Sequence, residues 1–135
     1  MSKKHIKWHK VQNYDVGEGP QRCEVVSLYE LKERENCAAP IRILFAPVGQ
    51  KDLLRQSVVA KTYCTDEDSE EFTRDIQTIL GGKLHEHLDA EGNFDFSAVE
   101  GRVVDVVVKN YHGSDHEKPF TYVSDVFSVE SRKAS

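Results

Sequence analysis

The stretch from Val103 to Val108 constrains the fold of this chain more than any other. It reads V-V-D-V-V-V, and branched side chains favour a pleated strand that is at least half buried. A polar loop containing Gly113 and a second alternating run follow, so residues 93–130 predict a short turn and a hairpin. An isolated two-stranded hairpin is marginal in water. The upstream chain must therefore supply a sheet for this hairpin to join.

The chain of 135 residues is long enough for one domain with a substantial core. Its sequence contains no run near the roughly 20 apolar residues needed to cross a bilayer. The basic N-terminus lacks the apolar segment of a signal peptide, so we expect a cytoplasmic protein. Three cysteines without C-x-x-C spacing argue against a disulfide framework and favour a reducing compartment.

The net charge of −5 argues against a protein that coats duplex DNA by charge alone. The charge is uneven, however. Four lysines precede the first acid, Asp15, whereas residues 66–71 are strongly acidic. A nucleic-acid partner is therefore compatible with the overall acidity.

Three segments alternate in the manner of strands: Gln21–Leu31, Ile41–Pro47 and Ser57–Cys64. Strict alternation in the first places Cys23 and Val25 on one face, and Val26 and Leu28 on the other. Short polar connections between the three segments predict an antiparallel meander.

The hydrophobic period changes after Thr65. Thr65-x-x-Asp68 and the acids that follow are typical of a helix N-terminus. An apolar stripe comes next, formed by Phe72, Ile76, Ile79 and Leu80. The pair Gly81-Gly82 then predicts the end of the helix, because glycine readily adopts the left-handed conformation.

The predicted element order is β-β-β-α-β-β, with the helix between the third and fourth strands. This order predicts a mainly β fold: a five-stranded Greek-key barrel of the OB type, whose closure removes exposed strand edges. An open β-sandwich, or an α+β sheet with the helix on one face, is the alternative. We expect a flexible basic arm at 1–15, a single OB-like domain at 16–130 and a frayed tail at 131–135.

Several segments resemble small phage and prophage proteins associated with replication, some of which are like single-stranded-DNA-binding proteins. The resemblance is one of pattern and is carried by residues 17–20 (GEGP), 79–82 (ILGG), 94–101 (FDFSAVEG) and 122–126 (YVSDV). It implies an OB-like fold and a role in DNA replication or recombination. The chain lacks the acidic C-terminal tail with which such proteins often recruit partners.

Binding of a single strand requires a basic groove and aromatic faces on which bases stack. The candidate nucleic-acid-binding residues are Trp8, Lys61, Tyr63, Arg102, Lys109, Tyr111, Lys118 and Tyr122. The alternative is that the aromatic residues belong to the core and the basic residues to a solvated face. These residues predict a non-catalytic module that binds single-stranded nucleic acid by base stacking and by contacts of its basic side chains with the backbone. The further partners that we consider are a second copy of the chain and replication proteins.

Other chemistry has weaker support. The pairs His85-x-His87 and His112-x-x-x-His116 lack the third and fourth ligands of a zinc site, so we expect no metal and no cofactor. Asp105 and Asp125 could form a carboxylate dyad on adjoining strands. Without a nucleophile or phosphate-loop motif, however, the chain is not expected to be an enzyme.

The main alternative to nucleic-acid binding is a protein-interaction module on the same scaffold, suggested by the acidic balance and by Val26 and Leu28. A barrel that binds a small ligand or a metal comes third.

Overall fold

The structure is a computed structural model that describes residues 11–13, 15–33, 37, 39–50, 55–111 and 120–129. The predicted tail and most of the predicted arm lie outside these residues. The strands are β1 (Val11–Asn13), β2 (Gly19–Glu30), β3 (Ile41–Pro47), β4 (Arg55–Ser57), β5 (Val59–Tyr63), β6 (Val103–Tyr111) and β7 (Phe120–Phe127). The helices are α1 (Ser69–Leu80) and the short 3-10 helices η1 (Leu84–His87) and η2 (Phe96–Val99).

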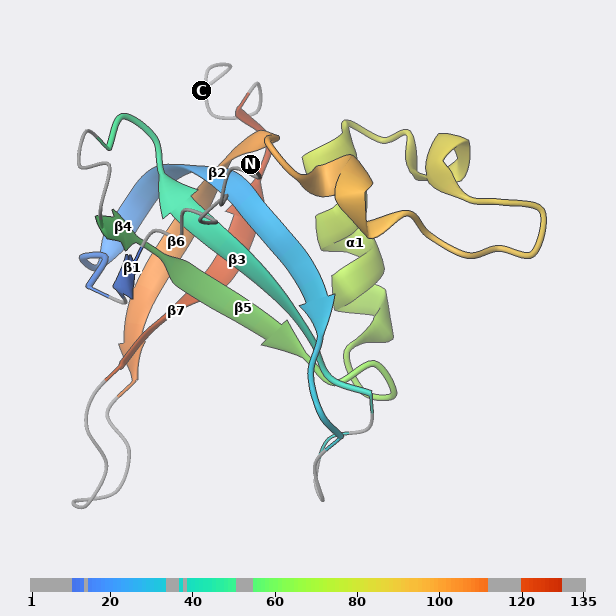
Figure 1. The fold of residues 1–135 in the computed structure, drawn as a ribbon, viewed down its shortest axis with the longest axis horizontal. Helices are drawn as coiled ribbons and strands as arrows, with labels where there is room; N and C mark the ends of the chain where they lie inside the picture. Colours follow the sequence, from blue (N-terminus) through green and yellow to red (C-terminus); the bar gives the residue numbers. More distant parts are fainter. Residues whose placement is uncertain are drawn as a thin grey trace, which may run out of the picture.

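Five of the strands form one antiparallel sheet in the order β5-β3-β2-β6-β7. The mainly β class, the five strands and the helix between the third and fourth of them are thereby confirmed (Figure 1). The bounds of β3 agree with the prediction at both ends. The parallel pair of β1 and β4 was not predicted, because each strand has only three residues and no measurable alternation.

The sheet curls strongly, so that its two outer strands approach each other. Cα atoms of β5 and β7 come within 8 Å, and β5 crosses in front of β7 in Figure 1. Among the described residues no hydrogen-bonded ladder joins these two strands. The prediction of a closed barrel is therefore not confirmed.

A β-bulge in β2 corrects the predicted faces of the first long strand. Val25 lies opposite Phe45 and Ser27 lies opposite Leu44, so Val26 is an extra residue. An extra residue reverses the facing of every side chain beyond it. Leu28 consequently packs in the main core, and the apolar pair Val26 and Leu28 does not form the outward patch that strict alternation suggested.

Helix α1 packs on the concave side of the curled sheet and contacts β7 and η2 (Figure 1). Its predicted apolar stripe is confirmed: Ile76, Ile79 and Leu80 are buried, and Phe72 packs against the same core. The helix ends as predicted at Gly81, whose φ of 71° lies in the left-handed region. It starts at Ser69, one turn later than Thr65, with Asp68 as the N-cap residue. The Asp68 side chain caps no helical N–H and accepts from Cys64 N instead.

A projecting arm, residues 83–101, connects α1 to β6 and extends away from the sheet (Figure 1). Leu84 packs against the core, but Leu88 is exposed and pairs with Phe94 in an isolated bridge. Asp95 caps η2 by accepting from Ser97 N. Phe94, Phe96 and Ala98 also pack against the core, so the arm is held by Leu84 and by its C-terminal half.

Candidate nucleic-acid interface

Three of the predicted binding residues lie together on the outer face of the β6–β7 hairpin. Lys109 and Tyr122 are directly opposite each other in the register, and Tyr111 lies two residues beyond Lys109 on the same face. Lys109 and Tyr111 are exposed, and Tyr122 is half-buried. We call Lys109, Tyr111 and Tyr122 the hairpin patch. It places one cation between two phenol rings on a solvent-facing surface, which is the combination that single-strand binding uses.

The bulge between Val107 and Val108 produces this arrangement. On one side of it Val107 lies opposite Asp125, and on the other Val108 lies opposite Val123. The shift turns Val123 into the core, where it is buried, and directs Tyr122 outward beside Lys109. The unpaired residue of this bulge is Ser124. If β7 alternated strictly through Ser124, Tyr122 would face the core and the patch would lack one of its rings.

Two acidic groups are placed near the hairpin patch. Asn110 donates through Nδ2 to Glu18, and Asp125 accepts from Ser124 Oγ at 2.8 Å. The local charge is therefore mixed rather than strongly basic. Lys109 is the one basic residue of the hairpin patch. Stacking of bases on the two tyrosine rings must consequently contribute much of the affinity for a single strand.

Lys61 and Tyr63 are not part of this surface. They lie beneath α1, where Lys61 is 6% exposed and Tyr63 is fully buried. Both donate to the same oxygen of Asp75 in α1: Lys61 Nζ at 2.6 Å and Tyr63 OH at 2.7 Å. We call Lys61, Tyr63 and Asp75 the buried triad. The two strand residues are occupied by this carboxylate, so they cannot contact a strand of nucleic acid.

The buried triad has a clear electrostatic character. Burial, reinforced by the Asp75 carboxylate, raises the pKa of Tyr63 well above its ordinary value, which keeps the phenol protonated as a donor. A second carboxylate lies at the edge of the group, with Glu71 Oε1 at 3.5 Å from Lys61 Nζ. The triad thus joins β5 to α1 through polar groups placed within an otherwise apolar core.

Of the remaining predicted residues, the structure describes only Arg102. Arg102 lies just before β6, at the end of the strand opposite the hairpin patch, and its Nε donates to Ala98 O at 3.3 Å. Trp8 and Lys118 lie outside the described residues. The structure therefore brings together three of the eight predicted binding residues.

The proposed carboxylate dyad is not formed. Asp105 is 2% exposed and is held by Arg22, whose Nε lies 3.1 Å from Asp105 Oδ1. Asp125 pairs in register with Val107 and is exposed. The sequence contained a signal for the Arg22–Asp105 ion pair, because a carboxylate buried in a valine-rich strand needs a cation nearby.

The projecting arm bears a shallow hollow lined by acids and aromatic rings. Its carboxylates are used by the local fold: hydrogen bonds from Asn93 lower the pKa of Asp89, and hydrogen bonds from Ser97 lower the pKa of Asp95. Within the described part of the chain, no group of three or more His, Cys, Asp or Glu side chains is arranged to hold a metal ion. Asp89 and Asp95 thus stabilise turns within the arm.

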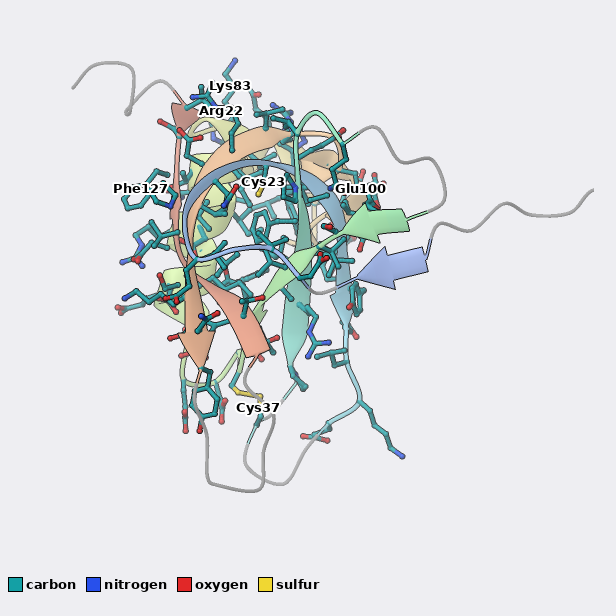
Figure 2. All side chains as sticks on the ribbon, turned by 90° about the vertical axis from the view of Figure 1, so that its left-hand side faces the viewer. Arg22, Cys23, Cys37, Lys83, Glu100 and Phe127 are labelled. Atoms are coloured by element: carbon teal, nitrogen blue, oxygen red, sulfur yellow. A yellow bond between two sulfur atoms is a disulfide. The ribbon has the colours of Figure 1, made fainter. Side chains whose placement is uncertain are left out.

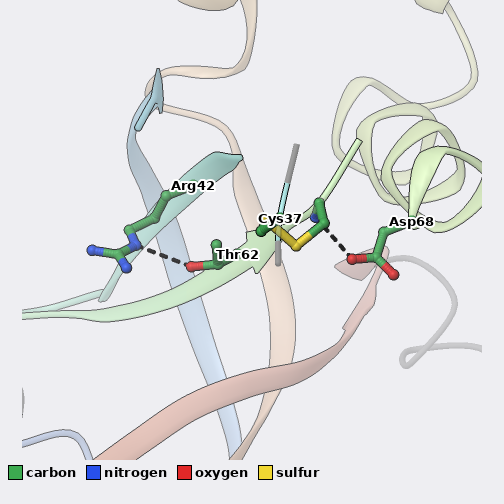
Figure 3. The surroundings of a disulfide bond; sticks show 5 residues. Cys37, Arg42, Thr62 and Asp68 are labelled. Atoms are coloured by element: carbon green, nitrogen blue, oxygen red, sulfur yellow. Dashed lines mark hydrogen bonds between the residues drawn. A yellow bond between two sulfur atoms is a disulfide. The ribbon is translucent and has the colours of Figure 1, made fainter. Parts of the chain in front are cut away.

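The cysteines require a correction. Cys37 and Cys64 form a disulfide, with Cα atoms 5.1 Å apart, although their spacing argued against a disulfide framework (Figure 3). They are 27 positions apart in the sequence, and the antiparallel pairing of β2, β3 and β5 brings them together. The expected reducing compartment loses its support, because two of the three thiols on which it rested are paired.

Cys23 is the remaining thiol and lies in the core of β2 (Figure 2). Burial, with a smaller effect of the Asp105 carboxylate, raises the pKa of this thiol from 9.0 to about 12. A buried thiol with a raised pKa is a poor nucleophile. Cys23 therefore serves as a small apolar group.

This shift predicts a loss of stability at alkaline pH. Above pH 9 the unfolded chain releases the Cys23 proton while the folded chain retains it, so stability falls as pH rises, until about pH 12. Between pH 8.5 and 10 we expect wild type to lose roughly 1 kcal/mol more than Cys23→Ala, measured by urea unfolding. Tyr63 is present in both proteins, so its own contribution to the pH dependence cancels in the comparison. Parallel pH profiles for the two proteins would contradict the prediction.

No family model and no curated protein matches this chain. None of the helices among the described residues is long and apolar enough to span a membrane. Any functional conclusion must therefore come from the sheet and the hairpin patch themselves.

Proposed function

We propose that the protein is a non-catalytic module that binds single-stranded nucleic acid through the hairpin patch. The observation that carries this proposal is the cross-strand placement of Lys109 opposite Tyr122, with Tyr111 on the same exposed face. Aromatic rings stack on bases of any sequence, and a neighbouring lysine contacts the phosphate backbone. Such binding has little sequence preference. A role in replication or recombination is suggested by the resemblance to phage and prophage proteins.

We further infer that the sheet is an OB-type Greek-key barrel in its partly open form. The order β5-β3-β2-β6-β7 places the first long strand at the centre, and the outer strands β5 and β7 curl towards each other. Helix α1 lies between β5 and β6 in the chain and covers the core. OB folds bind oligonucleotides on their sheet surface and through the loops beside it, which supports a ligand of this class.

Replacing Tyr122 with alanine is expected to weaken binding of a labelled single-stranded oligonucleotide roughly 5- to 150-fold. This range corresponds to the loss of one stacked base, about 1–3 kcal/mol. Fluorescence anisotropy at low salt measures the effect. Replacing Lys109 with alanine is expected to weaken binding and to reduce the slope of log K against log salt by about 0.7, because one phosphate contact is lost.

Matched controls come from the same molecule. Phe127→Ala removes an exposed ring from the outer face of β7 at its other end, and Lys83→Ala removes an exposed cation from the projecting arm. Both variants are expected to bind like wild type. Equal losses of oligonucleotide affinity for Tyr122→Ala and Phe127→Ala would show that the hairpin patch is not the specific binding site. No binding at tens of micromolar wild-type protein would refute the function.

Protein interaction is the second candidate, and one observation favours it. Val103 and Phe127 are 45% and 43% exposed and lie near the same end of the β6–β7 pair. In the register, Phe127 is opposite Asp105, and Val103 lies two residues before Asp105 in β6, beside the Arg22–Asp105 ion pair. Exposed apolar side chains on a sheet face are more typical of an interface than of a solvated surface. Light scattering after size exclusion tests this candidate. A strict monomer that retains no partner would count against it.

A further inference from the structure

The Cys37–Cys64 disulfide joins two connections that are distant in the sequence. Cys37 lies in the connection between β2 and β3, and Cys64 follows β5 directly, at the joint with α1 (Figure 3). Both residues are only partly buried, so a soluble thiol can reach the bond. A disulfide that reagents can reach is open to exchange in a way that a core disulfide is not.

The Cys64 side of the bond is firmly held. Cys64 O accepts from Glu67 N at 3.0 Å and from Asp68 N at 2.7 Å, and Cys64 N donates to the Asp68 carboxylate at 2.8 Å. Just before it, Tyr63 is fixed to Asp75 in α1. The joint between β5 and α1 is therefore a rigid anchor that does not need the disulfide for its own geometry.

The Cys37 side depends more on the bond. The base of the β2–β3 connection is closed by Leu31 N, which donates to Pro40 O at 2.8 Å. The disulfide adds a fixing point at residue 37, between these two ends. Cleaving the bond should therefore release the connection while leaving the anchor in place.

The third cysteine cannot compete in the exchange. Cys23 is fully buried, with a thiol that is protonated at neutral pH, so it neither attacks the disulfide nor traps a released thiol. The chemistry is thus confined to one pair. A confined pair switches between two defined states rather than scrambling.

We propose that Cys37–Cys64 is a redox-exchangeable site that fixes the β2–β3 connection to the β5–α1 joint when oxidised and releases it when reduced. A thiolate of a dithiol reductant attacks one protein sulfur, the S–S bond breaks, and the other sulfur leaves as a thiolate and takes a proton. The second thiol of the reductant then resolves the mixed disulfide. The protein gains two electrons and two protons as two thiols, and the dithiol becomes a disulfide.

The first test follows the thiols of the folded protein. After equilibration with mixtures of reduced and oxidised dithiothreitol, the protein is alkylated in denaturant and weighed by mass spectrometry. We expect one alkylated thiol (Cys23) in the oxidised state and three in the reduced state, with a single transition between them. Three free thiols under oxidising conditions, or one after excess dithiol, would overturn the redox site.

The second test follows the released connection by limited trypsin digestion after the exposed Lys32. Reduction is expected to speed cleavage there on the order of tenfold, because the tether no longer opposes local opening. The double variant Cys37→Ser/Cys64→Ser should be cleaved rapidly with or without reductant, and Cys23→Ala should respond like wild type. An unchanged cleavage rate on reduction would overturn the tether.

Discussion

Replacing Asp75 with alanine is expected to lower the free energy of unfolding by about 3–5 kcal/mol. The change removes the one carboxylate oxygen that accepts from both Lys61 and Tyr63. The phenol of Tyr63 would then remain in the core without its partner, and the Lys61 ammonium would keep only the longer contact with Glu71 at 3.5 Å. Buried polar and charged groups that lose their main partner are strongly destabilising. Urea unfolding followed by circular dichroism measures the loss, and the midpoint temperature should fall by on the order of 10 °C.

The matched control is Glu70→Ala, which removes an exposed acid from the first turn of the same helix. It is expected to cost about 0.3–1 kcal/mol through the helix dipole alone. If Asp75→Ala does not fold, the triple variant Lys61→Met/Tyr63→Phe/Asp75→Leu provides the test, because apolar replacement of a whole buried cluster is often neutral. A free energy of unfolding near that of wild type in the triple variant supports the explanation that Asp75→Ala destabilises by leaving Lys61 and Tyr63 without their shared carboxylate. A loss below about 1 kcal/mol for Asp75→Ala would mean that the three groups are hydrated.

The strands and the helix could be predicted because their signals are local. Alternation marked β3 to the residue, and the apolar stripe ending at Gly81-Gly82 marked α1. The bulge at Val26 could not be read from alternation, since it depends on pairing with β3. The residues did contain a hint: Val25 and Leu28 are both strongly apolar but three apart, which fits one face only with an extra residue between them.

The site was less predictable, because exposure depends on which face of each strand meets the core. Lys61 shares its face of β5 with Val59 and Tyr63, and these two apolar neighbours already indicated that Lys61 faces the core. A lysine that faces the core needs a carboxylate partner. That partner, Asp75, lies 14 residues away on a helix, beyond the reach of any local pattern. In contrast, Lys109, Tyr111 and Tyr122 were predicted from composition, and the hairpin register then brought them together.

Breaking the Cys37–Cys64 disulfide is expected to lower the free energy of unfolding by about 3–4 kcal/mol. The bond closes a loop across a sequence separation of 27, and restricting the unfolded chain by a loop of this length is worth about that much in the chain-entropy model. Urea midpoints of the oxidised and dithiothreitol-treated proteins measure the difference. The double variant Cys37→Ser/Cys64→Ser should show the same loss and no further response to reductant.

The size of this loss decides whether the redox site can act as a switch. Domains are typically stable by about 5–15 kcal/mol, so a loss of 3–4 kcal/mol leaves a folded reduced state only if the rest of the core is strong. The buried triad, which joins β5 to α1 independently of the bond, is the feature that should keep the reduced protein folded. Combining Asp75→Ala with reduction should therefore unfold the chain, whereas either change alone should leave a folded fraction. A folded doubly altered protein would show that neither contact limits stability.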